Sequence, residues 1–353
     1  PYSGGYFSPF NNPYLIDYPS EKGMSLSMKL ANETIKFIKT NKDSAFFAYL
    51  CFYAVHSPIQ TSESKWKKYR NKIDSIGFKE KGFEMNRILP ARKYQDNPIY
   101  AGLVEHVDDA VGSIMKTLEK LGIEENTIVV FTSDNGGVTS GDNYSTTSLK
   151  FRGGKGYQWE GGTRVPFIIK APGKKHFIEK TTPVTGADLY PTLLELAGLP
   201  QMPGQHKDGT SLVPLMDGGS ISKRSLYWHY PHYGNQGGQP HSIIQENGFK
   251  LIHYWENGHN ELYNLNNDVV EGHDLHNKNT KLTNELEHKL LSWLDEMNAR
   301  YPKRDTLFDP VRYQKKLNEY KNELMLKLEK QRKEIMQPGW QPNNDWWGSK
   351  TND

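Results

Sequence analysis

Residues 127–137 read TIVVFTSDNGG, and this stretch decides how the fold is interpreted. Its first six residues are mostly apolar and β-branched, which is typical of a short strand covered on both faces of a sheet. The polar residues Ser133, Asp134 and Asn135 follow directly, and two glycines allow a sharp turn of the backbone. Because ligands of open α/β sheets bind beyond the carboxyl ends of the strands, the sequence predicts a functional site at Asp134 and Asn135.

Segments with strand and helix patterns alternate on both sides of this stretch. The apolar runs in residues 43–55 (which include AFFAYLCFYAV) and 165–170 (VPFIIK) predict two further buried strands, and Cys51 would lie inert in the first. Apolar residues at helical spacing, caps and stop signals predict helices over residues 23–40, 97–121 and 188–197. This alternation predicts an α/β fold with a mainly parallel sheet flanked by helices.

The pattern changes after residue 224. Two strand-like runs, residues 242–246 and 249–255, flank Asn247-Gly248, a pair that favours a type I′ hairpin turn. A further turn precedes a strand over residues 261–265, so we expect a small antiparallel sheet. Two helices are predicted after it, over residues 282–301 and 311–336, and the tail contains Trp340, Trp346 and Trp347.

Composition excludes several classes of protein. The chain has 353 residues, of which 36% are hydrophobic, so it can bury a sizeable core. Its net charge of +3 is too small to indicate a nucleic-acid partner, and no apolar run approaches the ~20 residues of a membrane span. The single cysteine excludes an internal disulfide. We expect neither a nucleic-acid nor a membrane partner.

Three groups on or near the predicted strand ends can carry chemistry. Asp134 and Asn135 offer hard oxygen atoms that suit Ca²⁺ or Mg²⁺, although an Asx turn explains the pair equally well. Lys155 stands among three glycines (FRGGKG), where a backbone can approach an anion closely, although a flexible surface loop is the simpler interpretation. His56 follows the predicted strand of residues 43–55 and suits proton donation, unless it is a core histidine bonded to the backbone.

Other polar residues have weaker indications. His229 and His232 lie in the aromatic segment YWHYPHY, which suits stacking on sugar rings or, alternatively, packing against the main domain. For Arg164 we expect a structural salt bridge.

Five motifs in order resemble the formylglycine-dependent sulfatases, which are arylsulfatase-like members of the alkaline phosphatase superfamily. They are AVHSP at 54–58, LVEHVDDAVG at 103–112, the stretch at 127–137, FRGGKGYQWEGGTRVP at 151–166 and ELYNL at 261–265. The resemblance implies that residues 1–222 form the C-terminal part of the α/β catalytic domain. Residues 223–353 would form the antiparallel sheet subdomain with its helices and tail.

The resemblance also implies roles for individual residues. Asp134 and Asn135 match the pair that contributes to a Ca²⁺ site, Lys155 matches the lysine that contacts the sulfate, and His56 matches the histidine near the leaving oxygen. The family's nucleophile, a formylglycine made from Cys or Ser in C/S-x-P-x-R, has no counterpart here. We therefore expect that an N-terminal segment is missing, that the chain supplies half of the calcium site, and that it is inactive alone. An exposed apolar sheet edge should follow.

The expected function is hydrolysis of sulfate esters of a sulfated carbohydrate, with Lys155, His229 and His232 binding the substrate. One alternative is a phosphodiesterase or phosphonate hydrolase of the same superfamily, and another is a non-catalytic carbohydrate-binding remnant. The expected location is periplasmic or extracellular in a bacterium, although no signal peptide is visible in the chain.

Overall fold

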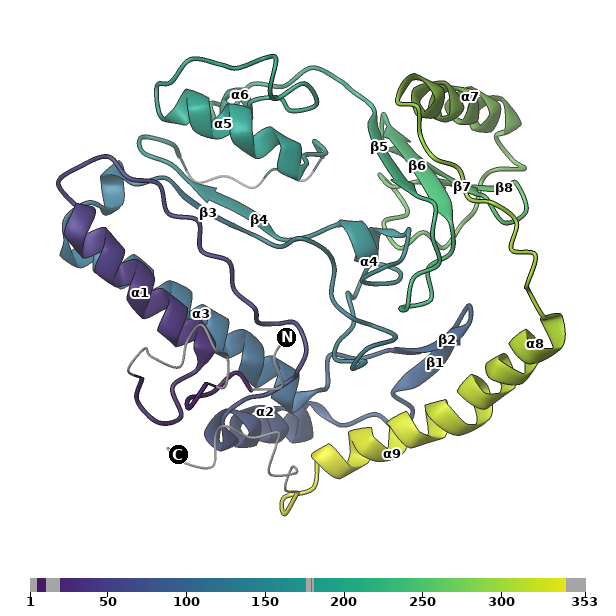
Figure 1. Cartoon of the computed structure of the whole chain (residues 1–353), viewed down its shortest axis with the longest axis horizontal. Helices are drawn as coiled ribbons and strands as arrows, with labels where there is room; N and C mark the ends of the chain where they lie inside the picture. Colours follow the sequence, from purple (N-terminus) through teal and green to yellow (C-terminus); the bar gives the residue numbers. More distant parts are fainter. Residues whose placement is uncertain (1–4, 11–19, 176–178, 180, 341–353) are drawn as a thin grey trace.

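A computed structural model describes residues 5–10, 20–175, 179 and 181–340 of the protein. Helices and three small antiparallel sheets make up the described part of the chain (Figure 1). The predicted Trp346 and Trp347 of the tail lie outside the described residues. No helix among the described residues is both long and apolar enough to cross a membrane.

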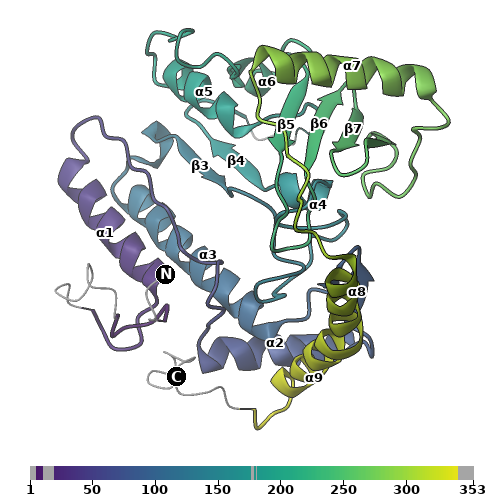
Figure 2. The same cartoon turned by 45° about the vertical axis from the view of Figure 1, so that its right-hand side comes forward.

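Three helices form the first layer. Helix α1 (Leu26–Asn41) lies beside α3 (Pro98–Lys120), and α2 (Glu63–Ile76) packs against α3 (Figures 1 and 2). Asn97 caps α3 as predicted, because its Oδ1 accepts hydrogen bonds from the N–H groups of Ile99 and Tyr100. Leu26, Trp66 and Leu103 are buried in the shared core. The helices predicted over residues 23–40 and 97–121 are thus confirmed.

The strand predicted at residues 127–132 forms as β3 (Val129–Thr132). It pairs with β4 (Phe167–Lys170), the predicted strand of residues 165–170, in a two-stranded sheet. The pairing is antiparallel, with Val130 opposite Ile169. All strand pairs in the described part of the chain are antiparallel. The parallel pairing that the alternation of elements predicted is therefore not seen here, because the chain reverses between β3 and β4.

The strand predicted over residues 43–55 does not form. The segment is extended, but no strand among the described residues lies beside it. Phe47 and Tyr49 are 76% and 83% exposed, and Cys51 is exposed, not inert in a core. An apolar run shows that residues suit a covered strand, but a strand exists only where a neighbour pairs with its backbone. The segment exposes apolar side chains, but it belongs to no sheet among the described residues, so it is not the exposed sheet edge that was expected.

The antiparallel sheet of the C-terminal part is confirmed. Strands β5 (Leu226–Tyr230), β6 (His241–Glu246), β7 (Phe249–Tyr254) and β8 (His259–Asn264) follow one another in space as in sequence. Asn247 and Gly248 have φ angles of 50° and 80°, as a type I′ turn between β6 and β7 requires.

Both faces of this sheet are covered. Successive side chains of a strand point to opposite faces, so Ile244 of β6 packs under α7 (Thr280–Glu296) while Ile243 faces the other side. Figure 2 shows α7 lying across the sheet. On the other face Tyr157 and Trp159, from the loop after Lys155, join the core. Full burial of each such large side chain stabilises the fold by about 1.5–3 kcal/mol.

Several short elements complete the chain. The predicted helix over residues 188–197 is α5 (Leu189–Leu196). The sequence analysis did not predict helix α2, the antiparallel pair of β1 (Phe83–Asn86) and β2 (Leu89–Arg92), or the short helices α4 (Glu160–Thr163) and α6 (Val213–Met216). All of these except α2 are only four residues long, too short for a periodic pattern to show.

The helix predicted over residues 311–336 is interrupted. Helix α8 (Pro310–Glu319) and α9 (Met325–Ile335) are joined by a π-helical segment (Tyr320–Leu324), and together they run from the antiparallel sheet back to α2 (Figure 1). At the end of α9, the indole N–H of Trp66 donates to the carbonyl oxygen of Ile335 at 3.0 Å.

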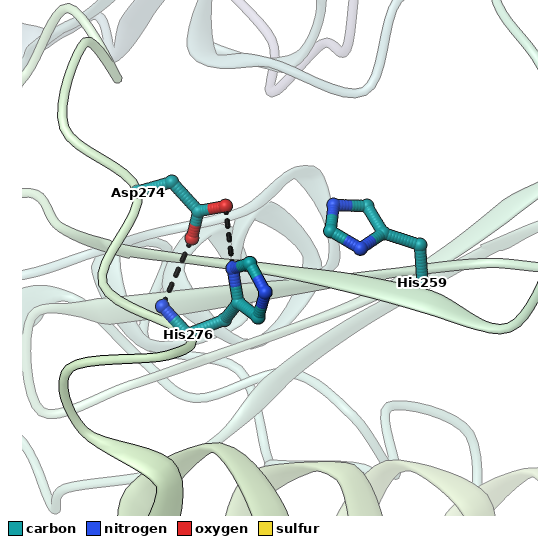
Figure 3. Close-up of side chains that lie close together, drawn as sticks. All are labelled: His259, Asp274 and His276. Atoms are coloured by element: carbon teal, nitrogen blue, oxygen red, sulfur yellow. Dashed lines mark hydrogen bonds and ion pairs between the residues drawn. The ribbon is translucent and has the colours of Figure 1, made fainter.

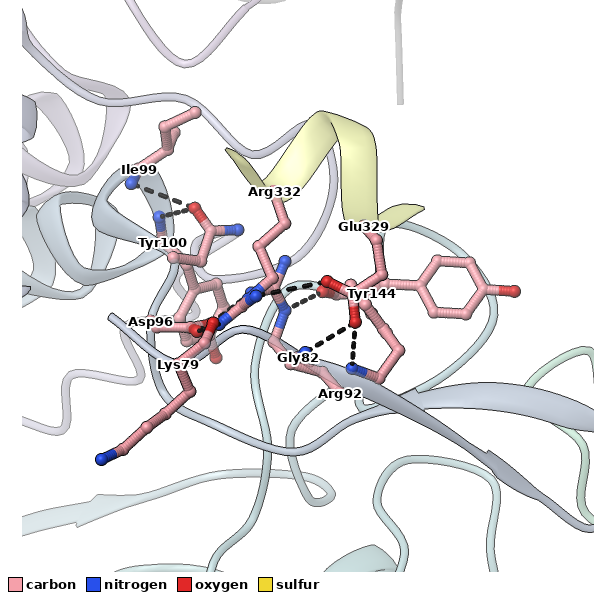
Figure 4. A network of polar contacts seen from close by, with 11 residues as sticks. Lys79, Gly82, Arg92, Asp96, Ile99, Tyr100, Tyr144, Glu329 and Arg332 are labelled. Carbon is pink, nitrogen blue, oxygen red and sulfur yellow. Dashed lines mark hydrogen bonds and ion pairs between the residues drawn. The ribbon is translucent and has the colours of Figure 1, made fainter. Parts of the chain in front are cut away.

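A buried charged network holds α9 in place (Figure 4). Arg332 is 2% exposed and donates to Asp96 Oδ2 at 2.8 Å and to the Lys79 carbonyl at 2.8 Å. Asp96 Oδ1 also accepts from Arg92 at 2.6 Å. Glu329, one turn earlier on α9, accepts from the N–H groups of Gly82 and Phe83. One carboxylate thus joins two arginines from distant parts of the sequence.

We predict that Arg332→Ala lowers the free energy of unfolding by about 3–5 kcal/mol, because it leaves buried acceptors without their donor. Urea unfolding measures the change. The matched control is Lys330→Ala on the same helix, whose side chain is 77% exposed and should contribute less than about 0.5 kcal/mol. Equal effects of the two substitutions would contradict the assigned role of the network.

Candidate active site

Asp134 and Asn135 lie directly after β3, where the sequence placed them. Asp134 Oδ1 accepts the N–H of Asn135 at 2.9 Å, and the Asn135 amide nitrogen donates to the Gly136 carbonyl at 2.9 Å. No hydrogen bond within the described residues occupies Asp134 Oδ2 or the Asn135 side-chain oxygen. Two hard oxygen atoms therefore remain available to a cation such as Ca²⁺. They fit such an ion but supply only part of its coordination shell.

Close backbone packing explains the glycine that follows. A Cβ atom on Gly136 would lie 1.8 Å from the carbonyl oxygen of Gly161, and the Gly136 N–H donates to the Gly162 carbonyl at 3.0 Å. A side chain cannot be accommodated at that distance, so residue 136 must be glycine. The contact places the Asp-Asn turn against the end of the Gly-rich loop.

Lys155 lies beside the same turn. Its N–H donates to the Gly137 carbonyl at 2.9 Å, and a Cβ on Gly154 would lie 2.4 Å from that oxygen. The ammonium group of Lys155 makes no hydrogen bond or ion pair with any described residue. The structure thus places the backbone of Lys155 beside the residues that follow the Asp134-Asn135 turn. This pairing is what a site for an anion beside a metal ion requires.

His56 is tied to the loop that follows Asp134 through the next residue, Ser57. The Ser57 hydroxyl accepts from the Asn143 amide at 2.9 Å, and Asn143 belongs to the loop after Asp134. The imidazole is exposed, with Nδ1 3.2 Å from the Ser57 carbonyl. His56 does not follow a strand, contrary to the expectation from the sequence. The segment before it is held by Tyr6, whose hydroxyl donates to the carbonyl oxygens of Tyr53 and His56.

A buried ion triad fixes the Gly-rich loop to the antiparallel sheet. Lys250 of β7 is 1% exposed, and its Nζ lies 3.0 Å from both Glu160 Oε1 and Glu271 Oε1. Glu271 Oε2 also accepts the N–H of Glu160 at 2.6 Å. The sequence analysis missed this triad; the signal was a lysine on the inward-facing register of β7, two residues before the buried Ile252.

Burial dominates the electrostatics of Glu271. It raises the pKa of this carboxyl from 4.5 to about 7, against the opposing effects of the Lys250 ammonium and the Glu160 N–H. The nearby Arg164 lies 3.5 Å from Glu160 Oε2, which confirms the expected structural salt bridge. At the start of the loop Arg152 stacks over Trp159, 3.7 Å from the ring centre. The loop with Lys155 is therefore held by both charge and aromatic packing.

The two candidate sugar-binding histidines have different surroundings. His229 is bonded at both ring nitrogens, to the Ser242 hydroxyl at 2.7 Å and to the Arg300 carbonyl at 2.9 Å, which favours a structural role. His232 is exposed, and its ring meets Tyr230 edge to face at 5.5 Å. The loop that follows His232 packs on the Gly-rich loop, because a Cβ on Gly238 would lie 1.9 Å from the Gly156 carbonyl.

Comparison with known proteins gives a consistent result. The model of the Sulfatase family matches residues 2–199, and the model described as N-sulphoglucosamine sulphohydrolase, C-terminal, matches residues 154–299. A sulfatase of Formosa agariphila is 33% identical over 336 residues, covering 84% of this chain and 57% of its own length. Human steryl-sulfatase is 29% identical over 241 residues, covering 65% of this chain and 36% of its own length.

Solved structures agree on the fold. The crystal structure of Ps i-CgsB aligns with a TM-score of 0.63 and 27% identity over 78% of this chain and 56% of the other. The sulfatase yidJ of Bacteroides fragilis, called putative in its description, aligns with a TM-score of 0.55 and 19% identity, covering 78% and 60%. These alignments confirm the predicted α/β sulfatase fold class. The chain spans about half the length of its bacterial curated relative and about a third of the human one.

We predict that Glu271→Gln changes the pH dependence of stability. The folded protein holds a proton on Glu271 up to a pKa of about 7, whereas the unfolded chain releases it near 4.5. The stabilisation from this proton is complete below about pH 4.5 and is lost as the pH rises through 7. Glutamine cannot ionise, so the variant should gain up to about 3 kcal/mol relative to the parent between pH 4.5 and 7.5.

Urea unfolding at a series of pH values tests this, with the exposed Glu256→Gln as control. The control should follow the parent at every pH. Parallel stability curves for parent and Glu271→Gln would show that the pKa of Glu271 is the same in the folded and the unfolded chain and would contradict the assignment.

Proposed function

This chain belongs to the sulfatase family of sulfuric ester hydrolases, and we propose that it supplies part of an active site that hydrolyses sulfate esters. One observation carries the proposal. The Gly137–Lys155 backbone hydrogen bond joins a turn with two free hard oxygen atoms to a loop with an unpaired ammonium group. A sulfuryl group, with its negative oxygens, suits a position between a bound cation and that ammonium group.

The family uses a metal ion and a formylglycine. We propose that Asp134 and Asn135 contribute two ligands to Ca²⁺, which prefers six to eight oxygen atoms. The remaining ligands would come from outside these residues. When bound, the ion would offset negative charge on the sulfuryl oxygens. The formylglycine would also lie outside these 353 residues, which contain no C/S-x-P-x-R.

The residues present have separable tasks. We infer that the Lys155 ammonium binds a sulfuryl oxygen and holds the ester while its S–O bond breaks. The His56 imidazole, with Nδ1–H facing the Ser57 carbonyl, has Nε2 available to pass a proton to the departing alcohol oxygen. Its tie to Asn143 through Ser57 would keep the ring beside the loop.

We propose a sulfated saccharide as substrate. The C-terminal half of the chain matches a family model named for N-sulphoglucosamine sulphohydrolase, and a mouse relative of 30% identity is an N-acetylgalactosamine-6-sulfatase. His232 and Tyr233 are exposed at the start of the loop that packs on Gly156, one residue from Lys155. They would contact the sugar. His229, whose two ring nitrogens are both hydrogen-bonded within the protein, would help to hold their segment in position.

Two further assignments remain proposals. We infer a boundary between residues 222 and 223, which lies in the connection between α6 and β5, so that residues 1–222 carry the catalytic groups and residues 223–353 the antiparallel sheet. We also propose a periplasmic or extracellular location, supported by the likeness to a bacterial sulfatase.

We predict that the product of the complete reading frame that encodes these residues hydrolyses sulfated saccharides and an aryl sulfate. Lys155→Ala should lower kcat/KM at least 100-fold, since it removes a charge that stabilises the transition state. The exposed Lys223→Ala is the matched control and should leave the rate unchanged. Assays on paired aryl sulfate, phosphate and phosphonate esters measure both.

Preference for the phosphorus esters would favour the hydrolases of the same superfamily that act on phosphorus. A reading frame without C/S-x-P-x-R, combined with saccharide binding and no turnover, would favour a non-catalytic protein. Either result would overturn the proposal.

We predict that the isolated 353-residue chain shows no sulfatase turnover and binds Ca²⁺ only weakly, with a Kd above about 1 mM. Two side-chain oxygens cannot replace the hydration shell of the ion. Titration calorimetry measures the affinity, and Asp134→Ala should abolish the residual binding. Submicromolar binding by the isolated chain would contradict the half-site.

A further inference from the structure

A second group of metal-ligating side chains lies on the antiparallel sheet, apart from the Asp134-Asn135 turn. His259 opens strand β8, and Asp274 and His276 lie in the segment that leads from β8 to α7 (Figure 3). Potential ligand atoms of the three side chains all lie within 4.8 Å of one another. Neither the sequence analysis nor the proposed sulfatase chemistry uses these residues.

The carboxylate of Asp274 is held in a fixed position. Its Oδ1 accepts the N–H of Leu262 at 3.0 Å and the N–H of His276 at 3.0 Å. Its Oδ2 lies 2.7 Å from Nδ1 of His276. Because Leu262 belongs to β8, these bonds attach the Asp274 segment to the strand that carries His259. The N–H of Leu275 adds a bond to the Leu262 carbonyl at 2.8 Å.

The two imidazoles are also oriented. Their ring centres are 4.9 Å apart and their planes are nearly perpendicular, at 88°. His259 is stacked on Tyr254 of β7, with the planes 13° apart. In the pair Asp274–His276 the atoms Oδ2 and Nδ1 lie 2.7 Å apart, so an ion bound by both would take the place of the proton between them. The pair therefore holds two ligand atoms side by side before any ion binds.

The donor set selects the kind of metal. Two imidazole nitrogens and one carboxylate suit a borderline ion such as Zn²⁺, whereas Ca²⁺ and Mg²⁺ prefer oxygen atoms alone. Zinc bonds of about 2.0–2.2 Å place tetrahedral ligand atoms roughly 3.4 Å apart, so side-chain shifts of about 1 Å close the site. The side chains of Asp274 and His276 are 30% and 26% exposed, which leaves an entry path and a position for water.

We propose that His259, Asp274 and His276 form a Zn²⁺ site that joins the beginning of β8 to the segment leading into α7. The proposal does not depend on the proposed sulfatase function. The ion would act as a clamp that closes the loop from residue 265 to 279 onto the sheet. If no metal bound here, the hydrogen bond between Asp274 and His276 would alone stabilise this loop, and His259 would form no hydrogen bond to it.

Zinc calorimetry on the chelator-treated chain tests the proposal. We expect one Zn²⁺ per chain, and His259→Ala and His276→Ala should each weaken binding at least tenfold. The exposed His288→Ala on α7 is the matched control, and Asp134→Ala tests the calcium half-site; neither should change the zinc affinity. Unchanged affinity in the His259 variant, an equal loss in the His288 or Asp134 variant, or no zinc binding at all would overturn the proposal.

A second readout avoids dependence on folding of a single variant. Co²⁺ bound by two histidines and a carboxylate should give visible absorption bands that Zn²⁺ displaces. His259→Ala, which removes no hydrogen bond of the loop, should lose these bands while its thermal unfolding without metal stays that of the parent. Bands that persist in this variant would place the ion elsewhere.

Discussion

The ion triad of Lys250, Glu160 and Glu271 is the interaction on which the arrangement of the site depends. Removing three ionisable groups from water costs several kcal/mol, and the Lys250 ammonium, 3.0 Å from an oxygen atom of each carboxyl group, offsets part of that cost. The triad fastens the end of the Gly-rich loop to β7. Lys155 lies five residues before Glu160, so the position of its loop is set by a sheet distant in sequence.

Aromatic packing supports the same contact. Tyr157 and Trp159 are buried against the face of the sheet that α7 does not cover, and Arg152 stacks on Trp159. The backbone of the loop then passes so close to the Asp134-Asn135 turn that only glycine fits at residue 136. The antiparallel sheet is therefore part of the construction of the candidate site.

Helix α9 and the segment of residues 43–55 are held differently. The charged network around Arg332 and Asp96 joins α9 to the segment before α3, while the extended segment of residues 43–55 has no strand beside it among the described residues. Phe47 and Tyr49 expose large apolar side chains there. An unpaired backbone that carries exposed apolar side chains promotes association with other chains. This is a practical concern for work with these 353 residues alone.

Local chemistry explains what the sequence by itself determined. The cap at Asn97, the turn at Asn247-Gly248 and the placement of Asp134 at a strand end depend on neighbours within a few residues, and all three were predicted correctly. The tertiary structure alone decided that residues 43–55 form no strand, that β3 and β4 are antiparallel, and that Lys250 lies between Glu160 and Glu271. Hydrogen-bond partners and buried charges come from segments far apart in the chain, and no local pattern specifies which distant segments will meet.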